Sequence, residues 1–131
     1  MMEFNWPGVL VATLLSFAFG ALWYSPLLFM KRWCRESGVD PAKDMANPLQ
    51  VYSTTFLLTL MSAFTLAFLL GPHPGIDSAL MVALLTGVGL TAASMGINYQ
   101  FAGRSRVYWF IDAGFHVCRF VIIALTLALW P

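Results

Sequence analysis

Four long apolar segments, separated by shorter polar stretches, dominate the pattern of this chain. The segments cover residues 6–30, 51–70, 78–100 and 107–130. Each is close to the roughly 20 residues that a helix needs to cross the hydrocarbon core of a bilayer. Short connections at 71–75 and 101–106 make consecutive helices antiparallel neighbours. The pattern therefore predicts an all-α fold, a polytopic membrane protein in which residues 1–131 form one four-helix bundle.

Basic residues indicate the orientation of this bundle in the membrane. Loop 31–50 contains four Lys or Arg residues and loop 101–106 contains two, whereas the turn at 71–75 contains none. Loops that remain in the cytoplasm carry an excess of Lys and Arg. We therefore expect loops 31–50 and 101–106 to be cytoplasmic and both termini to be non-cytoplasmic.

Composition narrows the class of protein further. The chain is 60% hydrophobic and only 10% charged, whereas soluble domains carry about 25% charged residues. The lipid bilayer is thus the expected surrounding, and a net charge of +1 gives no reason to expect nucleic acid as a partner. The sequence shows no nucleophile signature, phosphate-binding glycine loop or metal-ligand cluster. We expect no enzymatic activity, no cofactor and no metal.

A stripe of ionisable residues, Asp112, His116 and Arg119, lies inside the last apolar segment. Their spacings of four and three place them on one face of a helix. Each is unfavourable in a bilayer, by roughly 2.5–3.5 kcal/mol for a central Asp or Arg. Residues on the antiparallel segment 78–100 are the possible facing partners: Thr91, Ser94 and Asn98, with Gly87 leaving room for the arginine.

Three interpretations of the stripe follow from these positions. In the first, Asp112, His116 and Arg119 neutralise one another as a ladder along the helix. In the second, they line a proton pathway or a binding pocket, because intramembrane ionisable groups often mark such sites. In the third, Arg119 meets an acidic group on another chain. The sequence leaves all three open.

The end of the first segment carries an unusual motif, Trp23-Tyr24-Ser25-Pro26. Pro26 has no backbone donor and crowds the carbonyl of Leu22, so the helix should kink or end there. In lipid the freed carbonyl needs another partner, and Ser25 or a neighbouring helix could supply it. The nearby Trp33 belongs to a set of Trp and Tyr residues that we interpret as an interfacial aromatic belt.

Several stretches resemble the bacterial Domain of Unknown Function 1761 family. They are Asn5-Trp6, the run from Gly20 to Phe29 with its WYSP motif, Lys31-Arg32-Trp33, and the run from Tyr108 to His116. The resemblance covers nearly the whole chain and implies a small four-span protein of the bacterial inner (cytoplasmic) membrane. It implies no activity. Met30 stands where Gly is expected, and Arg119 is not part of the pattern.

Two classes of function remain. The absence of a catalytic signature favours a non-enzymatic accessory or structural subunit of a membrane protein assembly. The charged stripe favours the alternative, a small homo-oligomeric transporter or proton-linked channel built around Asp112, His116 and Arg119. Four helices cannot easily enclose a wide pore, so we expect either a homo-oligomer or a place in a larger membrane complex.

Overall fold

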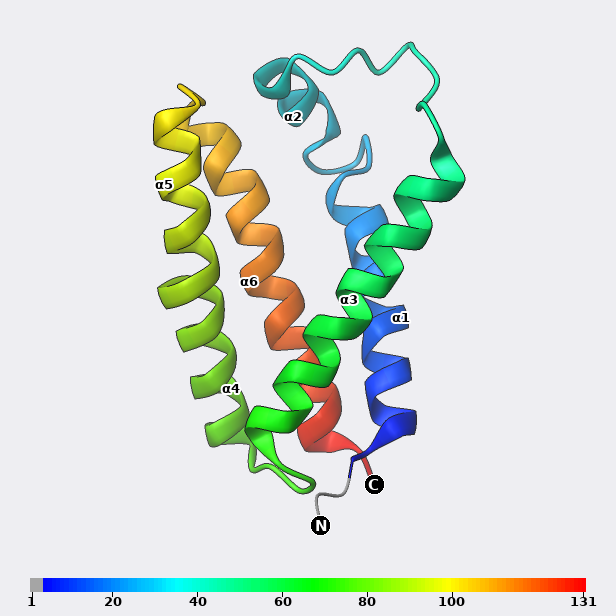
Figure 1. Cartoon of the computed structure of the whole chain (residues 1–131), viewed down its shortest axis with the longest axis vertical. Coiled ribbons are helices and arrows are strands. Elements are labelled where there is room, and N and C mark those ends of the chain that lie inside the picture. Colours follow the sequence, from blue (N-terminus) through cyan, green and yellow to red (C-terminus); the bar gives the residue numbers. More distant parts are fainter. Residues whose placement is uncertain (1–3) are drawn as a thin grey trace.

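A computed structural model describes residues 4–131 and shows an all-α fold (Figure 1). Within this part, four helices are long and apolar enough to cross a membrane. The elements in chain order are α1 (Trp6–Trp23), α2 (Met30–Ser37), α3 (Pro48–Leu70), α4 (Ile76–Leu84), the π-helical η1 (Leu85–Ala92), α5 (Ala93–Phe101) and α6 (Arg106–Leu129). The segments α4, η1 and α5 form one continuous helix, Ile76–Phe101.

The four long helices run alternately up and down (Figure 1). The start of α1, the turn at 71–75 and the end of α6 lie at one end of the bundle, and α2 lies at the other end. The basic loops at 31–50 and 101–106 therefore share the α2 end. This arrangement is the one expected from four antiparallel spans.

Helix α1 ends at Trp23, well before the expected limit at residue 30. Pro26 explains the early end, because its ring cannot continue the helix and it has no N–H for the carbonyl of Leu22. The Ser25 hydroxyl donates to that carbonyl instead, at 2.6 Å. The chain then turns, and α2 begins at Met30 and ends before Gly38, whose φ of 82° suits glycine.

Helix α6 lies at the centre of the bundle and contacts every other helical element. The apolar core lies toward the end of the bundle where α1 begins and α6 ends, around Phe120, Ile123 and Leu127 of α6. Small residues line the facing helices: Ala12 and Ser16 on α1, Ala63 and Ala67 on α3, and Ala79 and Ala83 on α4 are all buried. Small side chains let helix backbones approach closely, which is how helices associate in lipid.

Gly87 in η1 marks the closest approach of the third long helix to α6. A Cβ atom at this position would lie 3.2 Å from the Cα of Val117. The expectation that Gly87 leaves room for Arg119 is therefore wrong, because the space is filled by the α6 backbone and Phe120. The Arg119 side chain extends toward α3 instead, as described below.

Candidate functional site

Asp112 is buried, at 8% exposure, and accepts three hydrogen bonds from three other segments. Its Oδ1 accepts from the Tyr24 hydroxyl at 2.6 Å and from the Trp33 indole N–H at 2.9 Å. Its Oδ2 accepts from the Tyr99 hydroxyl at 2.5 Å. We call Asp112, Tyr24, Trp33 and Tyr99 the Asp112 cluster. The cluster joins the end of α1, helix α2 and helix α5 to α6 through one carboxyl group.

The WYSP motif supplies one member of this cluster and a second contact beside it. The Trp23 indole N–H donates to the carbonyl of Ile111 at 3.0 Å. Gly114 makes room for that ring, because a Cβ there would lie 3.3 Å from Trp23 Cζ2. Tyr24 reaches Asp112 directly, while Ser25 and Pro26 end α1 so that the chain can turn back with α2. The WYSP motif thus connects the end of α1 to α6.

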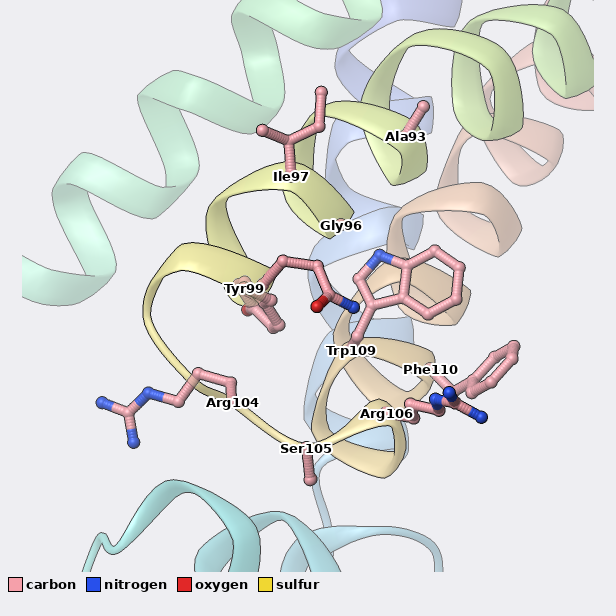
Figure 2. A pocket seen from close by; sticks show the side chains of 10 residues that line it. Ala93, Gly96, Ile97, Tyr99, Arg104, Ser105, Arg106, Trp109 and Phe110 are labelled. Atoms are coloured by element: carbon pink, nitrogen blue, oxygen red, sulfur yellow. The ribbon is translucent and has the colours of Figure 1, made fainter.

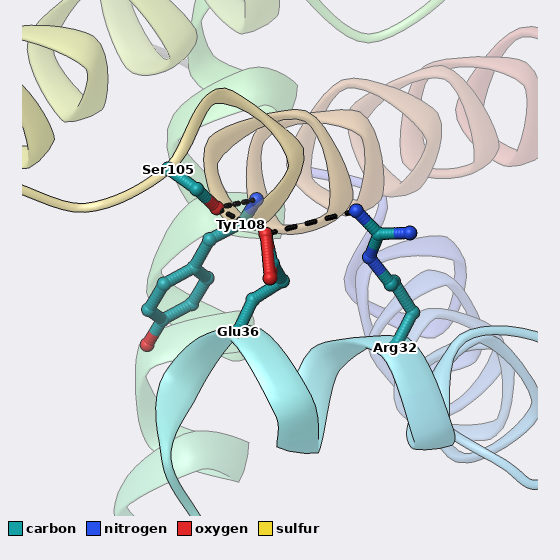
Figure 3. A network of polar contacts seen from close by, with 4 residues as sticks. All are labelled: Arg32, Glu36, Ser105 and Tyr108. Carbon is teal, nitrogen blue, oxygen red and sulfur yellow. Dashed lines mark hydrogen bonds and ion pairs between the residues drawn. The ribbon is translucent and has the colours of Figure 1, made fainter.

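Helix α2 is held over α6 by a second set of polar contacts (Figure 3). The Ser105 hydroxyl donates to Glu36 Oε1 at 2.6 Å, and the Arg32 guanidinium lies 3.8 Å from the same oxygen. Ser105 also caps α6, accepting from the Tyr108 N–H at 3.1 Å. The Ser105–Glu36 bond thus joins α2 to the start of α6, as the Trp33–Asp112 bond does further along α6.

His116 and Arg119 form a separate group deeper in the bundle. Arg119 Nε donates to His116 Nδ1 at 2.9 Å, and Arg119 Nη2 donates to Ser62 Oγ at 3.2 Å. The guanidinium also lies 4.7 Å from the centre of the Phe120 ring, a favourable cation–π arrangement. Arg119 Nη1 is buried and has no hydrogen-bond partner among residues 4–131.

The predicted stripe is therefore divided. His116 and Arg119 are paired, but the hydrogen bonds of Asp112 go to the cluster rather than to His116 or Arg119. In the described part of the chain, the one ion pair within 4.0 Å is Arg32–Glu36. A continuous Asp–His–Arg ladder is not present.

The residues proposed to face the stripe lie elsewhere. Ser94 and Asn98 are exposed and Thr91 is half-buried, and none of them is among the described partners of Asp112 or Arg119. The third long helix instead presents Tyr99, the neighbour of Asn98. Sequence reasoning missed Tyr99 and interpreted Trp33 only as an interfacial aromatic. The sequence did offer one indication: Tyr99 and Trp33 each have an apolar ring with one hydrogen-bond donor, and both are expected near the depth of Asp112 in the membrane.

The Tyr24 hydroxyl can be tested alone. Tyr24→Phe keeps the ring and removes one donor to Asp112, so it should lower the free energy of unfolding by about 1–2 kcal/mol. The matched control is Tyr52→Phe, because Tyr52 is exposed and contacts Phe17 through its ring. Denaturant titration in detergent micelles, followed by circular dichroism, measures both. Equal stability of the two variants would contradict the role of Tyr24.

Neither the cluster nor the His116–Arg119 pair has the composition of a metal site. No group of three His, Cys, Asp or Glu side chains that could hold a metal ion occurs in the part that the structure describes. A family model described as "Protein of unknown function (DUF1761)" matches residues 7–128. No curated protein and no solved structure matches the chain.

Proposed function

Because this chain belongs to the DUF1761 family, which carries no assigned activity, we propose from its geometry that it is a non-enzymatic accessory or structural subunit of a membrane protein assembly. The observation that carries this proposal is that the Asp112 cluster is formed entirely within one chain. All three donors to the carboxyl group come from the same chain, from residues 88, 79 and 13 positions away in the sequence.

A carboxyl group that is buried and bonded in this way suits a structural role. The three donors are themselves partly buried, and a donor that loses its acceptor away from water is unfavourable, so the four groups stabilise one another. The cluster also holds the polar end of the bundle together, where the apolar core does not extend. Asp112 is thus bonded within the fold, which supports a structural use for this member of the stripe.

We further propose that the protein lies in the bacterial inner membrane with its α2 end in the cytoplasm. The basic residues of loops 31–50 and 101–106 support this orientation, because such residues remain on the cytoplasmic side. Both termini would then face away from the cytoplasm. The bundle itself is small, which favours a homo-oligomer or a place in a larger complex.

One observation favours the alternative function, a small transporter or proton-linked channel. Arg119 is a buried cation whose Nη1 lacks a partner among the described residues, and His116 lies beside it. Buried ionisable groups that are incompletely paired occur on ion and proton pathways. The pathway would have to run between α3 and α6, where Ser62 contacts Arg119.

Purification from native membranes separates the two functions. As an accessory subunit, the chain should co-purify in mild detergent with one larger complex at a constant ratio, measured by native mass spectrometry. Purification as a free homo-oligomer alone would contradict the proposal. So would a proton or solute flux in proteoliposomes that Asp112→Asn or His116→Ala abolishes, since that result would establish the alternative.

A further inference from the structure

A cleft of about 480 Å³ lies between α5 and the start of α6, at the α2 end of the bundle. Toward the middle of the bundle it is lined by small and apolar residues of the third long helix, and its mouth is lined by polar residues near the connection to α6 (Figure 2). The residues lining the cleft include Ala93, Gly96, Ile97, Gln100, Arg104 and Arg106. The cleft thus changes from apolar to cationic along the membrane normal.

The shape of the cleft depends on Gly96 and Trp109. The Trp109 indole N–H donates to the carbonyl of Ala92 at 2.9 Å, which fixes the ring across the two helices. A Cβ atom on Gly96 would lie 3.3 Å from Trp109 Nε1, so a larger residue would press against the ring. The small side chains at positions 93 and 96 therefore leave a depression on a surface that faces lipid.

The mouth of the cleft carries two positive charges. Arg104 and Arg106 are exposed, and Figure 2 shows their side chains extending in opposite directions from the connection between α5 and α6. The Arg104 guanidinium lies 5.6 Å from the centre of the Tyr108 ring. Of the acids at this end, Glu36 is engaged by Ser105 and Arg32 (Figure 3), and Asp40 and Asp44 lie in the exposed loop after α2. In the described part of the chain neither guanidinium group lies within 4.0 Å of a carboxylate, so both charges can attract an anion at the level of the lipid headgroups.

We propose that this cleft binds a phospholipid with a negatively charged headgroup. The phosphate would be bound by Arg104 or Arg106 after a rotamer change of its exposed side chain, because guanidinium groups bind phosphate oxygens in a bidentate manner. One acyl chain would lie along Ala93, Gly96 and Ile97. Basic pockets beside membrane helices on the cytoplasmic side are suited to anionic lipids in this way. The cleft adjoins the Asp112 cluster, because Tyr99 lines the cleft and also donates to Asp112.

The test uses the full chain in nanodiscs or mild detergent and measures bound lipid by native mass spectrometry. The probes are phosphatidylglycerol, which is anionic, and phosphatidylcholine, which has no net charge. Arg104→Gln/Arg106→Gln should weaken retention of phosphatidylglycerol roughly tenfold or more. The matched control is Lys31→Gln/Arg35→Gln, which removes two exposed charges from α2 at the same end of the bundle.

A second variant tests the apolar part. Ala93 is exposed, so Ala93→Phe should fill the cleft without burying a new group in the core; it keeps both arginines and should also reduce phosphatidylglycerol retention. Equal losses in the two charge variants would overturn the site, because they would indicate only general attraction to the basic end. Equal retention of the two lipids by the unaltered chain, or no effect of Ala93→Phe, would overturn it as well.

Discussion

Replacing Asp112 with alanine is expected to lower the free energy of unfolding by roughly 3 kcal/mol or more. The substitution removes the acceptor for three donors at once, and each donor left unsatisfied in an apolar surrounding costs about 1–3 kcal/mol. The α2 end of the bundle should loosen first, because the apolar core lies toward the other end. Denaturant titration in detergent micelles by circular dichroism gives the global value.

Two comparisons make the Asp112 prediction specific. Asp112→Asn keeps one carbonyl oxygen as an acceptor, so its effect should be smaller than that of Asp112→Ala. Asp44→Ala removes an exposed loop carboxylate and should leave stability within about 0.5 kcal/mol of the unaltered chain. Tryptophan fluorescence should respond to Asp112→Ala because Trp33 is a direct partner. Similar stabilities for Asp112→Ala and Asp44→Ala would refute the structural role of the cluster.

Gly87→Leu is expected to have the second largest effect, a destabilisation of roughly 1–3 kcal/mol from overpacking. The new side chain would begin 3.2 Å from the Cα of Val117. A backbone atom cannot rotate away, so η1 and α6 would have to move apart. Separation of these helices would also weaken the contacts of the neighbouring core residues Ala83 and Phe120.

Gly89→Leu is the matched control for this substitution. Gly89 lies two residues further along the same π-helical segment, and a Cβ there meets nothing within 4 Å. The leucine should face lipid and leave stability unchanged or raise it by up to about 1 kcal/mol through better helix propensity. Thermal unfolding of both variants in the same detergent measures the difference. If Gly89→Leu were as harmful as Gly87→Leu, the close approach to Val117 would not be the cause.

Much of the fold could be predicted from the sequence. Four apolar runs of spanning length are a local property, and the breaker-rich turn at 71–75 and the short loop at 101–106 allow only antiparallel neighbours. One residue also predicted the early end of α1 in part: Pro26 indicated a kink or an end of the helix, and the structure shows an end at Trp23. The position of Ser25 next to Pro26 anticipated the partner of the Leu22 carbonyl.

The candidate site was only partly predictable. Periodicity placed Asp112, His116 and Arg119 on one face of α6, and it brought His116 within reach of Arg119 because those two residues lie on one helix. It could not show that Asp112 binds Tyr24, Trp33 and Tyr99. These donors are on other elements, and their approach depends on the turn after Pro26 and on how far each helix rotates about its axis.

The pattern of apolar and polar residues was enough to predict the number of spans, their boundaries to within several residues and the unfavourable charges inside the last one. These features follow from the length and polarity of consecutive residues. Packing between helices established which groups contact these charges, because the donors to Asp112 and the Ser62 acceptor of Arg119 lie on other elements of the fold. It therefore separated Asp112 from Arg119, and it assigned the carboxyl group to the fold rather than to an ion ladder.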